Sequence, residues 1–393
     1  MQLHNKGVVY MDNNATTCIA PEVAEAMMPF LTDFYGNPSS MHTFGGQVNN
    51  AVQQARASTA ELLGAEPEEI VFTSCGTESD STAILSSLQT YPGRRHIVTT
   101  RVEHPAVKSL CESIDQLTGR KHRITWIPVN PDGTLDIQKY RESLTEDTAI
   151  VSIMWANNET GVLFPVEEMA QIAKERDILF HTDAVQAVGK IPINLRDSAI
   201  DFLSLSGHKL HAPKGVGALY VARGTPFVPF LNGGHQEHGR RGGTENVASI
   251  IALGKACELA GLNMQEENSK VRFLRDKLEH GLLRTVPKAL LNGHKELRLP
   301  NTCNISFEYV EGEAILLYMN QHNICASSGS ACTSGSLEPS HVMRAMGVPF
   351  TAAHGSIRFS LSAYNTEAEV DFVLEKLPPI IAKLREMSPF WEG

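Results

Sequence analysis

Short, continuously apolar segments recur along the first two thirds of the chain and alternate with segments of helical periodicity. Six of them have the length of buried strands and cover residues 70–73, 97–100, 124–127, 149–154, 178–180 and 202–205. Strands of this kind are typical of a parallel sheet covered on both faces. Pro165 suits the first position of a helix that places Val166, Met169, Ala170 and Ala173 on one face. The alternation predicts a doubly wound α/β domain.

The pattern changes after about residue 260. A long amphipathic helix over residues 271–282 is followed by a mixed region. The last strong helix begins with a capping-box sequence at Thr366–Glu369, and Pro378–Pro379 should end or kink it. The sequence therefore predicts a large α/β domain and a smaller α+β domain. We expect the large domain over residues 15–260, and the small one over residues 1–14 and 261–393.

The composition excludes several classes of protein. Among 393 residues, 34 lysines and arginines stand against 44 aspartates and glutamates, and the net charge of −10 argues against a nucleic-acid binder or a protein of anionic membrane surfaces. The apolar fraction of 42% supplies a packed core. No apolar run reaches the ~18 residues of a membrane span, and the first residues lack a signal-peptide pattern. Seven cysteines without a disulfide spacing favour reduced thiols and a cytoplasmic protein.

Residues that follow the predicted strands are candidates for chemistry, because ligands of such sheets bind beyond the carboxyl ends of the strands. The turn at Gly76–Thr77 leads into a helix whose N–H groups suit a phosphate, although a plain capped turn is the alternative. Asp183 follows an apolar strand, where a carboxylate needs a cationic partner unless it only caps a helix. Lys209 follows another buried strand, and a desolvated lysine there can form a Schiff base.

A segment of small residues surrounds one cysteine in the second domain. Residues 327–336 are Ser, Gly, Ala and Thr apart from Cys332, the only strong nucleophile among them. Such a segment is typical of a flexible loop, where an exposed thiol is a poor structural choice. The alternative is a Ser- and Gly-rich linker with an incidental thiol. Cys325 follows Ile324 and looks more like a small buried hydrophobic residue.

In combination, these motifs resemble one family of enzymes. The sequence Ser206–Lys209, with Pro213 and Lys214 after it, is similar to the pyridoxal-phosphate lysine motif of class V aminotransferase-fold enzymes. The resemblance narrows to cysteine desulfurases through four further features: Asp183–Gln186, His104, Asn158 and the sequence around Cys332.

The resemblance covers essentially the whole chain. The segments Tyr10–Thr17 and Gly36–His42 are also similar to cysteine desulfurases. Residues 155–160 and 336–346 look most like the nitrogenase-associated, NifS-type branch, and the housekeeping iron–sulfur branch is a near neighbour. The family implies the aspartate-aminotransferase-like fold type I of pyridoxal 5′-phosphate (PLP)-dependent transferases, with PLP as cofactor.

The resemblance also implies roles for single residues. Lys209 would hold the cofactor and move protons at the substrate Cα, Asp183 would pair with the pyridinium nitrogen, and His104 would stack on the ring and act in acid–base steps. The implied cofactor-binding residues are Gly76, Thr77, His104, Asn158, Asp183, Gln186, Ser206, His208, Lys209 and Thr244. Among these, Gln186 would contact the ring hydroxyl, and Thr244 would come from the other subunit.

The implied reaction converts L-cysteine to L-alanine. Cys332 would attack the substrate sulfur and carry it as a persulfide, so that Cys332, Lys209 and His104 form the catalytic set. Asn37 and Arg358 would bind the substrate carboxylate. The family implies a homodimer that supplies sulfur to a scaffold protein for iron–sulfur cluster assembly. It implies no metal of the enzyme's own, although Cys332 would be able to contact an iron–sulfur cluster on a partner.

Other functions stay open at this stage. The same fold serves housekeeping iron–sulfur desulfurases, selenocysteine lyases and class V aminotransferases. A catalytically inert PLP-binding or assembly protein is a further alternative, but it has no chemical need for Lys209, Asp183, His104 and Cys332 together.

Overall fold

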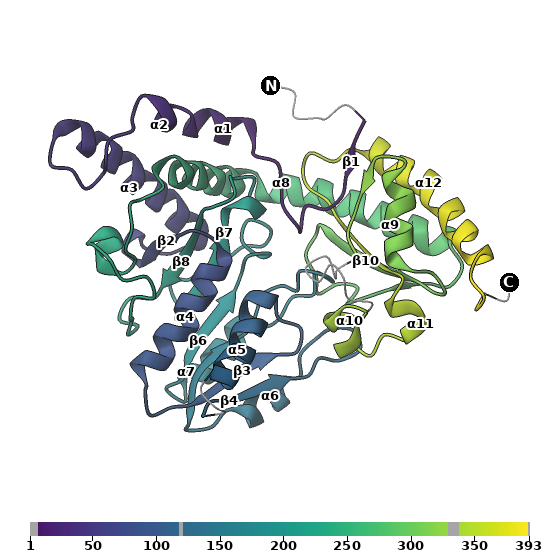
Figure 1. The fold of residues 1–393 in the computed structure, drawn as a ribbon, viewed down its shortest axis with the longest axis horizontal. Helices are drawn as coiled ribbons and strands as arrows, with labels where there is room; N and C mark the ends of the chain where they lie inside the picture. The colour runs from purple at the N-terminus through teal and green to yellow at the C-terminus, as the bar shows by residue number, and fades with distance from the viewer. Residues whose placement is uncertain (1–6, 118–120, 329–337, 392–393) are drawn as a thin grey trace.

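A seven-stranded sheet forms the centre of the larger of two units in the computed structural model, which describes residues 7–117, 121–328 and 338–391 (Figure 1). All six predicted segments form strands, five of them with shifted ends. These strands are β2 (Ile70–Thr73), β3 (His96–Thr100), β4 (Arg123–Ile127), β5 (Thr148–Ser152), β6 (Leu179–Asp183) and β7 (Phe202–Ser206), and β8 (Gly217–Val221) is an additional seventh strand. Their order in the sheet is β2-β8-β7-β6-β5-β3-β4.

The sheet is mixed, whereas the sequence predicted a parallel one. β7, β6, β5, β3 and β4 are parallel neighbours, but β8 is antiparallel to both β7 and β2. β8 returns from β7 over a short connection, which allows only antiparallel pairing. β4 was also predicted to be buried, yet it is the edge strand and only its last residue, Ile127, is fully buried.

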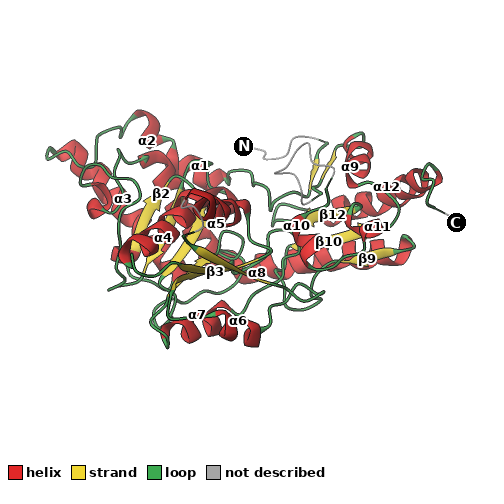
Figure 2. Cartoon of the chain, turned by 60° about the horizontal axis from the view of Figure 1, so that its bottom comes forward, coloured by secondary structure: helices red, strands yellow, loops and turns green. Residues whose placement is uncertain are grey.

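Helices cover both faces of this sheet, which confirms the doubly wound α/β prediction. α4 (Gly76–Thr90) and α5 (Pro105–Leu117) pack on one face. α3 (Thr43–Leu63), α6 (Ile137–Ser143) and α7 (Val166–Lys174) pack on the other, and Figure 2 shows α6 and α7 on the side of the sheet opposite α5. The four apolar residues predicted for α7 are buried, and Pro165 is its N-cap. The remaining elements of this unit are α1 (Pro21–Met27), α2 (Pro29–Thr32), η1 (Pro67–Glu69), η2 (Gly207–Lys209) and η3 (Gln236–Gly239).

The smaller unit is built on an antiparallel sheet in the order β12-β10-β9 and on the parallel pair β1–β11. Its strands are β1 (Val9–Tyr10), β9 (Ala289–Leu291), β10 (Thr302–Phe307), β11 (Ile324–Cys325) and β12 (Ser356–Ser360). Its helices are α9 (Gly312–Asn320) and α12 (Glu367–Glu386). Between β11 and β12 lie α10 (His341–Ala345), whose buried Val342 and Met343 pack in the core of the larger unit, and α11 (Phe350–Ala353). The predicted capping box of Thr366 and Glu369 begins α12. Pro378–Pro379 do not end this helix, because the burial of Leu377, Ile380 and Ile381 stabilises its second half.

One helix, α8 (Val247–Thr285), connects the two units (Figure 1). Its residues 250–257 belong to the core of the larger unit, and residues 271–282 belong to that of the smaller one. The expected domain boundary at residue 260 therefore falls inside a continuous helix. By length and composition α8 is the only helix in the described part of the chain that could cross a membrane, but 44% of its most apolar window is buried in the protein. This burial is typical of a core helix of a soluble protein.

Candidate active site

A cavity of about 270 Å³ lies beyond the carboxyl ends of β5, β6 and β7, where they meet the N-terminus of α4 and the smaller unit. It brings together residues that are far apart in the sequence. Ten residues predicted for the site line this cavity: Gly76, Thr77, His104, Asn158, Asp183, Gln186, Ser206, His208, Lys209 and Arg358. The position agrees with the rule that ligands of such sheets bind at the strands' carboxyl ends.

Lys209 is held by the backbone of the N-terminal segment. It follows β7 in the short helix η2, and its Nζ donates hydrogen bonds to the carbonyl oxygens of Asn14 and Ala15. The Asn14 side chain is itself fixed, because its Nδ2 donates to Thr302 Oγ1 at 2.9 Å and its Oδ1 accepts from Asn301. The sequence reasoning assigned no role to Asn14, although the Tyr10–Thr17 motif was the signal.

Asp183 ends β6 as a buried carboxyl group. Its Oδ1 accepts a hydrogen bond from Val185 N at 2.9 Å. Burial, and then the nearby carboxyl group of Asp80, raise the pKa of Asp183 to about 6. Among the described residues no ion pair to Asp183 is found. A protonated ring nitrogen in the cavity would supply the missing positive charge, so this residue fits the pyridine end of PLP.

The N-terminus of α4 provides a place for a phosphate. Gly76 begins this helix, and a Cβ atom there would lie 2.7 Å from Val185 Cγ2 and 3.6 Å from Ser206 Cβ, so only a glycine leaves this space open. His208 borders the same cavity, and its Nδ1 lies 3.1 Å from Thr16 Oγ1. Burial lowers the pKa of His208 to about 4, so the ring is neutral near pH 7. Helix N–H groups, a hydroxyl and a neutral imidazole suit the phosphate end of PLP.

His104 presents a neutral imidazole to the cavity. It lies just before α5, and its Nδ1 accepts a hydrogen bond from Ala106 N at 3.1 Å. Burial lowers the pKa of this histidine, and the neighbouring Asp183 opposes that shift. Because Nδ1 is an acceptor, the proton of the neutral ring is on Nε2. His104 can therefore offer one exchangeable proton.

Arg358 brings the smaller unit into the site. It lies in β12, where its Nη1 donates to the carbonyl oxygen of Asn158 at 3.0 Å and its Nη2 pairs with Asp12 Oδ1 at 2.8 Å. Its Nε is buried without a hydrogen-bond partner in the described part of the chain. A substrate carboxylate would have to share this guanidinium with Asp12.

Two predicted residues are not brought to the cavity, and a third lies outside the described part of the chain. Asn37 is exposed between α2 and α3, where its Oδ1 accepts from Ser39 N at 2.8 Å. Thr244 is exposed after η3. Neither residue lines the cavity of its own chain. Cys332 lies outside the described residues. Cys325 is half-buried in β11, and burial followed by the charge of Asp12 raises the pKa of its thiol.

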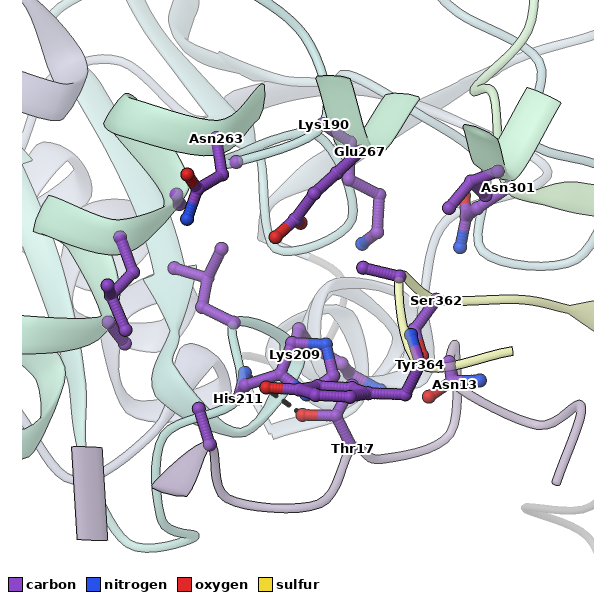
Figure 3. Close-up of a pocket in the computed structure, with 18 of the residues that line it drawn as sticks. Asn13, Thr17, Lys190, Lys209, His211, Asn263, Glu267, Asn301, Ser362 and Tyr364 are labelled. Carbon is purple, nitrogen blue, oxygen red and sulfur yellow. Dashed lines mark hydrogen bonds between the residues drawn. The ribbon is translucent and has the colours of Figure 1, made fainter. Parts of the chain in front are cut away.

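A second cavity, of about 200 Å³, shares Lys209 with the first one (Figure 3). Figure 3 shows Lys190 and Glu267 across this cavity from Tyr364 and His211. Lys209 is the only predicted site residue among those lining it. The predicted site is therefore the cavity that holds Asp183 and His104. Ala156, Val185 and Ser327 also line that cavity; they lie in motifs that the sequence analysis noted, but no role was assigned to them. Asp80 and Met154 line it as well and carried no recognisable signal in the sequence.

Comparisons with known proteins identify the family. A family model described as aminotransferase class-V matches residues 9–373. The chain is 61% identical to the cysteine desulfurase NifS of Azotobacter vinelandii over 98% of this chain and 95% of that protein. It is 62% identical to a cysteine desulfurase of Gluconacetobacter diazotrophicus over 98% of this chain and 96% of that protein.

A solved structure described as a NifS-like protein superposes with a TM-score of 0.89 at 39% identity, and the match covers 96% of this chain and all of that one. Aminotransferases of class V use PLP, and the Asp183 carboxylate and the α4 N-terminus fit its two ends. The fold, the site and these similarities establish that the chain belongs to the cysteine desulfurases of the aminotransferase class-V family.

Proposed function

We propose that this enzyme converts L-cysteine to L-alanine and transfers the sulfur to Cys332 as a persulfide. The observation that carries the proposal is the convergence of Lys209, Asp183 and His104 on one cavity beyond the ends of the central strands. PLP, when bound, would supply an electron sink for the substrate Cα. A lysine, a buried carboxyl group and a neutral imidazole around one cavity are the protein groups that such chemistry needs.

We assign to each residue the task that the family resemblance implies. Lys209 would hold PLP and move the proton at the substrate Cα. Asp183 would keep the ring nitrogen protonated, while Gln186 would orient the ring through its hydroxyl group. His104 would stack on the ring and exchange the proton on Nε2. The Cys332 thiolate would attack the substrate sulfur, forming an S–S bond while the substrate C–S bond breaks and its electron pair stays with carbon.

The proposal includes a homodimer with sites completed by the partner subunit. Asn37 and Thr244 are exposed and lie outside the cavity of their own chain, so a second copy would have to present Thr244 to the phosphate site. Large apolar side chains are exposed around α2 and the following loop, close to Asn37 in sequence. They are Met28, Leu31, Phe34, Tyr35 and Met41. An apolar surface of this kind suits contact with another protein.

We infer that the sulfur serves iron–sulfur cluster assembly for nitrogenase, through a scaffold protein in the cytoplasm. The inference is supported by the 61% identity to the protein named NifS. A housekeeping iron–sulfur desulfurase and a selenocysteine lyase are the alternatives with the same fold. Comparing kcat/KM for L-cysteine and L-selenocysteine tests the lyase alternative. Restoring nitrogenase activity in a host that lacks its own desulfurase tests the assignment to nitrogenase.

The first experiment measures alanine and sulfide formed from L-cysteine with a reductant. Wild type should form both products, and Cys332→Ala should form neither while its PLP absorbance still changes on addition of cysteine. Cys325→Ala is the matched thiol control and should remain active. Lys209→Ala should lose both activity and the visible absorbance of bound PLP. If Cys325→Ala is the inactive variant, the nucleophile is misassigned. If wild type forms no alanine, the desulfurase function is wrong.

A further inference from the structure

Two ionisable side chains lie beneath Asp183 and have no role in the proposed reaction. His181 is two residues before Asp183 in β6, so both side chains point to the same face of the sheet. Asp80 reaches them from α4, which covers that face. Asp80, His181 and Asp183 are only 1%, 0% and 6% exposed. Burying three ionisable side chains side by side lowers the stability of the fold, which suggests that the cluster has a function in the site.

Hydrogen bonds fix the His181 ring between two strands. Its Nδ1 lies 2.8 Å from Ser152 Oγ in β5, and its Nε2 lies 2.9 Å from Ser204 Oγ in β7. Asp80 Oδ1 is 3.5 Å from the same Nε2. This oxygen is buried and has no hydrogen-bond partner in the described part of the chain. A shift of about half an ångström would bring Asp80 Oδ1 and His181 Nε2 to hydrogen-bond distance, with room for one proton between them.

The surroundings favour a proton on Asp80 more than on His181. Burial raises the pKa of Asp80 to about 7, although Ser204 donates a hydrogen bond to it. Burial lowers the pKa of His181 to about 4. The Asp80 charge in turn is one of the causes that raise the pKa of Asp183. Near neutral pH the pair therefore gains or loses a single proton beside Asp183.

Two further titratable groups face this cluster. Glu103, just after β3, is buried and accepts hydrogen bonds from Thr100 Oγ1 and Met154 N. Burial is the main cause that raises its pKa to about 8, and Asp183 and Asp80 contribute. His104 faces Asp183 from the cavity side and lowers its pKa. Neither group contacts Asp80 through a hydrogen bond or ion pair, so each should titrate whether or not Asp80 is present.

We propose that Asp80 and His181 are positioning residues that hold one exchangeable proton beneath Asp183 and so set the negative charge that faces the cofactor's ring nitrogen. With the proton, the pair is neutral and Asp183 alone carries the charge. Without the proton, Asp80 adds a second negative charge close to the ring nitrogen. The two negative charges together bind a protonated ring nitrogen more strongly than Asp183 alone. The inference rests on the proposed placement of that nitrogen at Asp183.

The first test needs no cofactor. In the apoprotein, the ¹⁵N resonances of His181, assigned through a His181→Gln variant, should shift with an inflection near the pH at which the pair loses its proton, about 7. Asp80→Asn keeps the size and hydrogen bonds of the side chain but removes the acid, and it should abolish this inflection. A wild-type His181 without an inflection between about pH 6 and about pH 8, or an inflection that survives in Asp80→Asn, overturns the inference.

The second test measures the release rate of PLP from the holoenzyme over the same pH range. Release from wild type should slow by about tenfold as the pH rises through about 7, because one buried charge is added near the ring nitrogen. Asp80→Asn should lose this step, whereas the exposed control Asp197→Asn should keep it. A purely structural role would change the rate without removing the step, so a retained step in Asp80→Asn contradicts the inference.

The two proposals fail in different ways. If Asp183→Asn releases PLP no faster than wild type, the placement of the ring nitrogen at Asp183 is wrong, whatever the apoprotein titration shows. If Asp183→Asn releases PLP faster but Asp80→Asn behaves like wild type in both experiments, the placement stands and the proton-holding pair is refuted.

Discussion

Replacing Gly76 by alanine tests whether the start of α4 is as tightly placed as the structure shows. The new Cβ would lie 2.7 Å from Val185 Cγ2, whereas real Cβ contacts essentially never fall below 3.0 Å and ordinary contacts lie at 3.4–4 Å. Either Val185 or the first turn of α4 must move by about 0.7 Å. Overpacking of this kind typically costs about 1–3 kcal/mol of stability. The same displacement moves the helix N–H groups that we assign to the phosphate, and each ~1.4 kcal/mol lost there raises the Kd of PLP tenfold.

The assay combines urea unfolding of the apoprotein with PLP titration followed by visible absorbance. Gly76→Ala should unfold at lower urea and bind PLP at least several-fold more weakly. Adding Val185→Ala removes the atom that clashes, and the double variant should recover part of both losses. Gly93→Ala is the matched control, because a Cβ at Gly93 meets no atom within 4 Å. If Gly76→Ala keeps wild-type stability and wild-type PLP affinity, the inferred close packing of Gly76 against Val185 at the N-terminus of α4 is wrong.

Two other predictions concern buried charges. Arg56→Met should lower stability by about 3–5 kcal/mol, measured by urea unfolding, because it removes the buried ion pair of Glu237 and leaves Phe72 N as the only hydrogen-bond donor to this carboxylate within the described residues. Adding Glu237→Gln should restore part of the loss, and an unchanged midpoint in Arg56→Met contradicts the prediction. Burial raises the pKa of Glu159 to about 7 against the opposing effects of Ser340 and Arg358. The folded-state value lies above the unfolded one, so wild type loses stability as the pH rises from about 4.5 through about 7. Glu159→Gln should therefore gain in urea midpoint over wild type across that range, and a difference independent of pH would refute this.

Local patterns in the sequence were sufficient for much of the larger unit. Five of the six apolar segments became strands that are buried between two layers of helices, where mostly apolar side chains are favoured on both faces. The sixth, β4, lies at the edge of the sheet. β8 was missed because Gly217–Val221 follows a turn rich in Gly and Pro and has no helix before it. The full length of α8 was missed because half of the helix packs against each core, so no single apolar stripe runs along it.

The residues of the site also fall into those that the local sequence predicts and those that it does not. Lys209, Asp183 and the Gly76 turn could be predicted because each lies at or just beyond the end of a buried strand, and the family resemblance added their roles. Asp80 could not, because its contact in the site is to His181, about one hundred positions away in the sequence. Asn14 lies in the Tyr10–Thr17 motif, but its role depends on Thr302, which is still farther away in the sequence. Asn37 and Thr244 show the remaining limit, since one chain alone does not bring them to the cavity.

Because α8 is continuous, the number of residues in it sets both the distance and the relative rotation between the two cores. A helix of 39 residues is about 58 Å long, and each residue turns it by about 100° and advances it by about 1.5 Å. Inserting one residue between positions 257 and 271 would swing the smaller unit about the helix axis and carry Arg358, together with its partner Asp12, away from Asn158. Seven inserted residues would almost restore the angle but separate the cores by about 10 Å. Relatives that keep this helix unbroken should therefore vary in the lengths of their surface loops and not in the length of this connection.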